Sequence, residues 1–131
     1  MNVPDDLRYT ADHEWVRLED GKARIGITDY AQDALGDVVF VQLPEPGATV
    51  KAGDSFSEVE STKSVSDLYS PVSGVITERN TRLEDAPELI NQDPHGDGWM
   101  VVIEISEASD FDQLLTAEDY QRFLETEAKP H

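Results

Sequence analysis

The stretch EVESTKSVSDLYSPVSG, residues 58–74, decides the fold, because it sets one lysine between two short segments that can extend. Glu58 to Thr62 and Val65 to Ser70 show the polar alternation of strands, which predicts the two arms of a hairpin. Lys63 lies at the predicted tip, and the nearest other lysine is Lys51. The segment therefore predicts a solitary ammonium group on an exposed hairpin.

On both sides of this hairpin the chain shows short strands separated by turns. Residues 14–28, EWVRLEDGKARIGIT, predict a second hairpin, because Asp20-Gly21 accepts the positive φ angles of a tight turn. The other expected strands are DVVFVQL at 37–43, GVITE at 74–78 and WMVVIEI at 99–105. Short strands with frequent turns indicate a mainly β fold, either a sandwich or a barrel.

Two segments switch to the spacing of helices. Thr28 or Asp29 can cap a short helix that Gly36 ends. Near the C-terminus, Thr116 and Asp119 resemble a capping box and predict a final helix. The apolar stripes of these helices are Ala31, Ala34 and Leu35 in the first, and Tyr120, Phe123 and Leu124 in the second.

Apolar positions in the middle of the chain also recur at a spacing of 33 residues, as in Val39 with Val72 and Leu43 with Ile76. Two similar β halves related by an approximate two-fold axis would explain this recurrence. Lys63 would then lie on the connection between the halves. The alternative interpretation is coincidence.

Composition restricts the class of protein and its partners. The length of 131 residues fits one domain, with 38% hydrophobic and 29% charged residues, as in globular proteins. Ten basic residues against 28 acidic ones give 10 − 28 = −18. This charge repels nucleic-acid phosphates and anionic lipids, so we expect neither as a partner. A basic protein surface would complement the charge, although solubility alone explains it equally.

The chain contains no cysteine, which excludes disulfides, cysteine–zinc sites and a cysteine nucleophile. The N-terminal MNVPDDLRYT has neither the apolar segment of a secretory signal nor an arginine-rich amphipathic segment. No stretch of the sequence is long and apolar enough to span a bilayer. We therefore expect a cytoplasmic protein, with a mature organellar form as the alternative.

No arrangement of side chains indicates autonomous catalysis. His13, His95 and His131 lack a metal-ligand spacing, and DPHGDG at 93–98 does not match a calcium-binding loop. Lys63 has two interpretations: a solvated lysine that discourages edge pairing, or a modification site whose amine an enzyme can acylate. The neighbours that would leave room for such an enzyme are the small residues Ser61, Thr62 and Ser64.

Five motifs then decide between these interpretations. They are HEW at 13–15, GITDYAQDALGDVVFVQLPEPG at 26–47, ESTKSVSDLYSPVSG at 60–74, PELIN at 87–91 and DPHGDGW at 93–99. In this order, and over essentially the whole chain, they resemble the H proteins of the glycine cleavage system. Each motif alone is weak, but the set is highly specific.

The resemblance implies lipoate as the cofactor, in amide linkage to Lys63. It also implies the barrel-sandwich hybrid fold of lipoyl and biotinyl domains, with two antiparallel sheets, short flanking helices and a C-terminal helix. Residues 1–131 would form a single lipoyl-carrier domain, with N- and C-terminal extensions around a core of about 37–105. The protein would be a carrier subunit of a multienzyme system and not an enzyme.

The partners implied by the resemblance are enzymes that use the lipoyl arm. A glycine decarboxylase loads an aminomethyl group, an aminomethyltransferase passes the carbon to tetrahydrofolate, and a dihydrolipoyl dehydrogenase reoxidises the arm. A lipoyl or octanoyl transferase, or a lipoate ligase, would attach the group. The carrier would be a monomer, and its chemistry would belong to the cofactors.

The resemblance further implies that the loaded amine is held in a surface cleft. Glu14, in the HEW motif, is the candidate contact to this cationic amine, and Asp67 is a second candidate, because a carboxylate is the suitable partner. Either residue could instead be a solvated surface acid. Three alternatives remain for the whole chain: a lipoyl relay to other proteins, a biotin carrier, and an unmodified acidic β domain. Biotin is disfavoured because Thr62 and Ser64, rather than methionines, flank the lysine.

Overall fold

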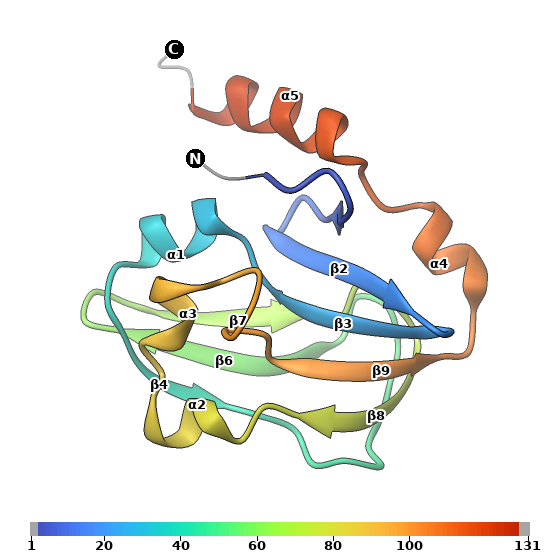
Figure 1. The fold of residues 1–131 in the computed structure, drawn as a ribbon, viewed down its shortest axis with the longest axis horizontal. Helices are drawn as coiled ribbons and strands as arrows, with labels where there is room; N and C mark the ends of the chain where they lie inside the picture. Colours follow the sequence, from blue (N-terminus) through green and yellow to red (C-terminus); the bar gives the residue numbers. More distant parts are fainter. Residues whose placement is uncertain (1–2, 129–131) are drawn as a thin grey trace.

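The computed structural model describes residues 3–128, which form a mainly β fold of two sheets (Figure 1). One sheet has six strands in the order β1-β2-β3-β9-β8-β5, and the other has three in the order β4-β6-β7. Neighbouring strands pair antiparallel in both sheets. The strands are β1 (Arg8–Tyr9), β2 (Glu14–Glu19), β3 (Lys22–Ile27), β4 (Val38–Gln42), β5 (Thr49–Val50), β6 (Ser55–Ser61), β7 (Val65–Tyr69), β8 (Gly74–Arg79) and β9 (Val101–Ile105).

Short helices flank these sheets. Within residues 3–128 they are α1 (Asp29–Leu35), α2 (Arg82–Asp85), α3 (Leu89–Gln92), α4 (Ala108–Asp112) and α5 (Ala117–Ala128). Figure 1 shows α5 as the C-terminal helix, lying beside the N-terminal segment at one end of the molecule. The predicted fold class is thereby confirmed. No helix in this part of the chain is long and apolar enough to cross a membrane.

The hairpin predicted at residues 14–28 is present, with its turn at Asp20-Gly21. Asp20 and Gly21 have φ angles of 50° and 78°, and β2 and β3 pair along their whole length on either side of them. Trp15 lies opposite Gly26, where a Cβ would come within 2.7 Å of the indole nitrogen. Glycine at position 26 is therefore what allows the indole to lie against the neighbouring strand.

Both predicted helix caps are also present. The side chain of Thr28 accepts a hydrogen bond from the backbone N–H of Ala31 at 3.2 Å, and α1 ends at Gly36 with φ of 83°. Thr116 and Asp119 exchange the two hydrogen bonds of a capping box at the start of α5. These local contacts satisfy backbone groups that a helix end leaves unpaired.

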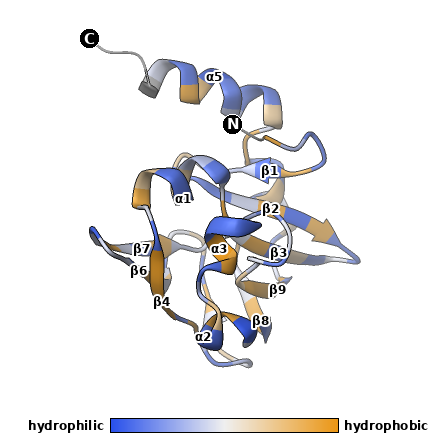
Figure 2. Ribbon diagram, turned by 60° about the vertical axis from the view of Figure 1, so that its left-hand side comes forward, coloured by the Kyte–Doolittle hydropathy of each residue, from blue (hydrophilic) through white to orange (hydrophobic). Residues whose placement is uncertain are grey.

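The main core lies between the two sheets. Each large aliphatic side chain that it buries contributes about 1.5–3 kcal/mol to folding. Figure 2 shows hydrophobic residues along strands such as β4 and β9, and a mixture of both kinds along α5. Fully buried members of this core include Val16, Ile25, Val59, Val72, Ile76, Leu83, Ile90 and Ile103.

A second, smaller cluster fixes α5 to the sheet. It consists of Leu7, Tyr9, Trp15, Ala117 and Tyr120, all of them buried. The rings of Tyr9 and Tyr120 stack with their centroids 4.5 Å apart. This stacking joins the C-terminal helix to the first strand, and the site described below uses the same tyrosine.

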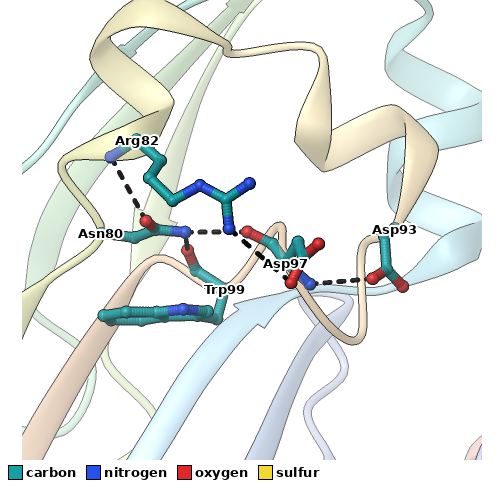
Figure 3. Close-up of polar contacts among 5 residues, drawn as sticks. All are labelled: Asn80, Arg82, Asp93, Asp97 and Trp99. Carbon is teal, nitrogen blue, oxygen red and sulfur yellow. Dashed lines mark hydrogen bonds and ion pairs between the residues drawn. The ribbon is translucent and has the colours of Figure 1, made fainter.

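The DPHGDGW segment folds as a structural loop. The buried Asn80 side chain donates hydrogen bonds to the carbonyls of Asp97 and Trp99, each at 2.8 Å (Figure 3). The carboxylate of Asp93 accepts from the Asp97 N–H at 2.9 Å, and Arg82 forms an ion pair with Asp97 at 3.8 Å. The oxygens of this loop are therefore engaged in holding its own shape.

The 33-residue recurrence does not correspond to equivalent positions. Val39 lies inside β4 and is half exposed, whereas Val72 lies in the turn before β8 and is fully buried. Leu43 follows β4, whereas Ile76 is inside β8. The pairing inferred from this recurrence is wrong, although Lys63 does lie on the connection between two strands.

Candidate functional site

The turn that carries Lys63 joins β6 to β7 and is braced by a buried serine. The Ser61 hydroxyl accepts hydrogen bonds from the N–H groups of Lys63 and Ser64, both at 3.1 Å. The Ser61 N–H donates to the Ser64 carbonyl at 2.8 Å and closes the turn. Ser61, which we expected only to leave space around the lysine, therefore holds the turn in shape.

A second contact ties the turn to the end of α1. The N–H of Thr62 donates to the carbonyl of Asp37 at 3.0 Å. Asn91 in turn fixes this connecting segment, because its side chain donates to the Gly36 carbonyl at 2.8 Å and accepts from the Val38 N–H at 2.9 Å. The lysine turn, the end of α1 and the start of β4 thus form one hydrogen-bonded unit.

The aliphatic stem of Lys63 lies over Gly36. A Cβ at position 36 would come within 3.2 Å of Cε and 3.5 Å of Nζ of the lysine. Position 36 also has φ of 83° and ψ of −159°, a conformation that residues other than glycine rarely adopt. Glycine is required here both for the backbone conformation and for the path of the lysine side chain.

A cleft of about 370 Å³ opens beside the turn, between α1 and the edge strand β7. One end of it includes Leu35 and Ser64, close to Lys63, and the other end includes His13 and Tyr69. The complete lining is Asp12, His13, Ile27, Tyr30, Ala31, Ala34, Leu35, Ser64, Ser66, Asp67, Leu68 and Tyr69. The cleft therefore begins at the lysine turn and follows α1 toward its N-terminus.

The lining suits an aliphatic chain with a cationic end. Its middle is formed by small or apolar side chains such as Ala31, Ala34 and Leu68. Two carboxylates, Asp12 and Asp67, are the charged side chains in this lining, which includes no lysine or arginine. Opposite charge at short range, in a partly enclosed space, favours a bound ammonium group.

Glu14 lies directly behind this lining. It is 1% exposed, and its carboxylate accepts hydrogen bonds from the Tyr69 N–H at 2.8 Å and from the Thr10 hydroxyl at 3.1 Å. Burial raises the pKa of Glu14 from 4.5 to about 8, against the opposing effect of these two hydrogen bonds. Glu14 is therefore a buried acid and not a solvated surface acid.

The two predicted acids therefore occupy different positions. Asp67 is exposed and lines the cleft directly, whereas Glu14 is buried one layer deeper, at the start of β2. Both are brought to the cleft, and Lys63 is at its other end. The role of each in holding an amine stays a prediction.

Sequence reasoning missed several residues of the site. Asp12, Tyr30 and Tyr69 line the cleft, and Asn91 braces the lysine turn from another part of the chain. Asn91 falls in the PELIN motif, so the motif pointed to it without indicating what it does. Asp12 precedes the lysine turn by some 50 residues in the chain, and only the fold brings it into the same cleft.

The histidines have structural environments. His13 has φ of 67°, and its Nδ1 lies 2.9 Å from the hydroxyl of Tyr120, which is also 2.7 Å from the Thr28 hydroxyl. His95 is buried, accepts a hydrogen bond from the Asp29 N–H at 3.3 Å, and has its pKa lowered by that burial. His131 lies outside the described residues. Among residues 3–128, no group of three potential ligands could hold a metal ion.

Two sheets that present one lysine on a braced turn, beside a cleft, define a small carrier-type domain. The family model for the glycine cleavage H-protein matches residues 7–127. The chain belongs to this family.

Individual relatives agree with this assignment. The chain is 54% identical to the glycine cleavage system H protein of Oceanobacillus iheyensis over 95% of this chain and 99% of the relative. It is 60% identical to the H protein of Mycobacterium avium over 88% of this chain and 89% of that relative. The crystal structure of an H protein from Mycobacterium marinum superposes with a TM-score of 0.85 at 47% identity, over 97% of this chain and all of that one.

Proposed function

We propose that Lys63 carries a lipoyl group in amide linkage, and that the protein shuttles an aminomethyl group and reducing equivalents between three enzymes. These are the glycine decarboxylase, the aminomethyltransferase and the dihydrolipoyl dehydrogenase. The observation that carries this proposal is the position of Lys63, on a braced turn at the mouth of a cleft with an apolar middle and acidic side chains. The whole chain acts as one carrier domain and catalyses no step itself.

The residues present fit the lipoyl group. When bound, the group supplies a dithiolane that accepts the carbon unit and two electrons. Its acyl chain is aliphatic, as is the middle of the cleft. From Val65 to Tyr69 the strand β7 rises about 13 Å, at roughly 3.3 Å per residue, so an arm fixed at Lys63 can lie along the strand toward its far end.

The acids at the cleft then hold the amine. Asp67 faces the cleft and meets an ammonium group directly, while Glu14 lies behind Tyr69 and responds to the added positive charge. Because a nearby cation favours the ionised carboxylate, loading lowers the pKa of Glu14 from about 8. Between the lowered pKa and about pH 8, loading therefore releases a proton from Glu14. A charge-assisted contact of this kind is worth about 1.5–3 kcal/mol.

The attachment site is tested with the Lys63→Arg variant. Arginine keeps the charge of the side chain but offers no comparable amine for acylation. After expression with lipoate, intact mass and peptide mapping should show one lipoyl group on the wild type, at Lys63, and none on the variant. Full lipoylation at another lysine, with carrier activity intact, would contradict the assignment.

The absence of cysteine provides an independent test. Since the chain has no thiol of its own, every thiol in the reduced protein must come from the arm. After mild reduction and removal of the reductant, titration should detect the dithiol pair in the wild type and no thiol in Lys63→Arg. An unmodified acidic domain would show no thiol in either protein.

Retention of the loaded amine tests the two acids. Glu14→Gln removes the carboxyl group that loading would ionise, and Asp67→Asn removes a carboxylate, both with little change in shape. Both should release ammonia and formaldehyde faster than wild type, by about ten- to a hundred-fold for the acid that makes the contact. Glu125→Gln, on the exposed side of α5, is the matched control. Equal decay in all four proteins would remove both acids from the proposal.

A further inference from the structure

The outer face of the three-stranded sheet carries exposed apolar side chains beside the lysine turn. Val39, Phe40 and Val65 are 51%, 55% and 57% exposed. Single exposed hydrophobic residues are common on protein surfaces, but a contiguous group indicates a binding surface. These three residues come from β4 and β7, on either side of β6.

The strand register brings them into one row. Phe40 lies opposite Glu60, and Glu60 lies opposite Val65, so the three side chains are neighbours across the sheet. Directly opposed residues in antiparallel strands have Cβ atoms about 5 Å apart. A register shift between Val38 and Phe40 leaves Val39 exposed next to Phe40. We call Val39, Phe40, Glu60 and Val65 the outer row.

The position of the outer row relative to Lys63 is fixed by the hairpin. The row crosses β6 and β7 at the last residue pair before the turn, because the next pair is Ser61 with Ser64, which closes it. The following row, Val41 with Val59, faces inward and is buried. The outer row is therefore the surface of the sheet closest to the lysine.

Apart from Lys63 itself, the charged side chains on and beside the outer row in the three-stranded sheet are acidic. Glu60 lies inside the row, and the next outward row across β6 and β7 pairs Glu58 with Asp67, which also borders the cleft because β7 is the edge strand. The strands β4, β6 and β7 contain no lysine or arginine. A complementary partner therefore presents an apolar centre flanked by basic side chains.

We propose that the outer row is the docking surface for the enzyme that acylates Lys63, an inference that rests on the proposed function. An enzyme that acts on the bare lysine must reach an amine only one side chain away from the backbone, so it must contact the surface next to the turn. The opposite side of the turn is occupied by the end of α1 and the cleft. Enzymes that act on the dithiolane react at the far end of the arm, which the proposed function directs along β7 away from the turn.

The reaction at this surface is an acyl transfer. The enzyme brings an activated acyl donor, an acyl adenylate or a thioester. The Lys63 amine forms a bond to the acyl carbon, the bond from that carbon to the phosphate or sulfur breaks, and the amine loses its protons to solvent. The chain contributes the amine and the docking surface, and no redox step is involved.

The test compares matched substitutions of exposed strand residues. Phe40→Ser and Val65→Ser change the outer row, and Val75→Ser changes a valine that is 40% exposed on β8 of the other sheet. Since all three side chains are exposed, thermal unfolding should change little. With a lipoate ligase, lipoate and ATP, kcat/KM for acylation followed by intact mass should fall about tenfold or more in Phe40→Ser and Val65→Ser, mainly through KM. Val75→Ser should stay within about twofold of wild type.

A second measurement separates attachment of the arm from its use. Both outer-row variants can be acylated to completion by long incubation and then supplied to the decarboxylase and the dehydrogenase, which should use them at the wild-type rate. Equal acylation of all variants and wild type would overturn the inference and leave the proposed function intact. Slower use of the acylated variants with unchanged acylation would assign the surface to a different partner and also overturn it. A wild type that the ligase does not acylate at all would overturn the proposed function itself.

Discussion

Replacing Glu14 by glutamine should stabilise the protein relative to the wild type, and this difference should grow as the pH rises. The carboxyl group is 1% exposed and holds the Tyr69 N–H and the Thr10 hydroxyl. Burial raises its pKa from 4.5 to about 8, so the folded protein keeps a proton that the unfolded chain loses. Glutamine keeps a similar shape and a hydrogen-bond acceptor, but it cannot ionise.

The sign and the size follow from proton linkage. Between pH 4.5 and about 8, the unfolded chain binds fewer protons at this position than the folded chain does. The free energy of unfolding of the wild type therefore falls with rising pH across this range and levels off above it. At about 1.36 kcal/mol per pH unit, the full range corresponds to roughly 5 kcal/mol as an upper limit. The Glu14→Gln variant lacks this loss.

Urea unfolding at pH 5, 7 and 9 measures the effect. The difference in unfolding free energy between Glu14→Gln and wild type should be within about 1 kcal/mol at pH 5 and should reach several kcal/mol at pH 9. Glu125→Gln, at an exposed position, should follow the wild type at every pH. If Glu14→Gln and wild type show parallel pH profiles, the carboxyl group ionises normally in the folded protein, and the argument from burial fails.

Three further predictions concern other contacts. Gly36→Ala and Gly53→Ala should each lower the free energy of unfolding by about 1–3 kcal/mol, because both positions have positive φ. Only Gly36→Ala should also slow acylation, since its Cβ would meet the side chain of Lys63. Tyr120→Phe should lower the free energy of unfolding by about 1–3 kcal/mol and speed loss of the loaded amine, because the Tyr120 hydroxyl joins His13 in the cleft to Thr28, the cap of α1. Tyr9→Phe should affect stability alone, and equal amine loss in the two variants would refute this coupling. Because the net charge is −18, added salt should lower the association rate with partner enzymes more than it raises the dissociation rate, and a salt-independent association rate would contradict electrostatic steering.

Local signals were the most informative part of the sequence. The Asp20-Gly21 turn, the Thr28 cap and the capping box of Thr116 with Asp119 each depend on residues that are close in the chain, and all three were predicted correctly. The hairpin that carries Lys63 was predicted for the same reason. The class of fold followed because strand and turn signals alternate along most of the chain.

Contacts between distant segments could not be predicted in the same way. Glu14 is buried because the end of β7, about 55 residues later in the chain, lies against the start of β2. The sequence therefore showed an acidic residue but not that it is shielded from solvent. The apolar run at 37–43 indicated a strand but not which of its side chains face solvent, and Phe40 faces outward because the three-stranded sheet has one solvent-facing side. The core boundaries of 37–105, the monomeric state and the cytoplasmic location stay predictions.

The hydrogen bond from Thr62 to Asp37 has a consequence for how the arm moves. The anchor of the proposed lipoyl arm and one wall of its cleft belong to a single hydrogen-bonded unit. We therefore expect an arm that leaves the cleft to give up only its own contacts, without any segment of the chain having to open. A partner enzyme would then withdraw the arm by offering it a better binding site.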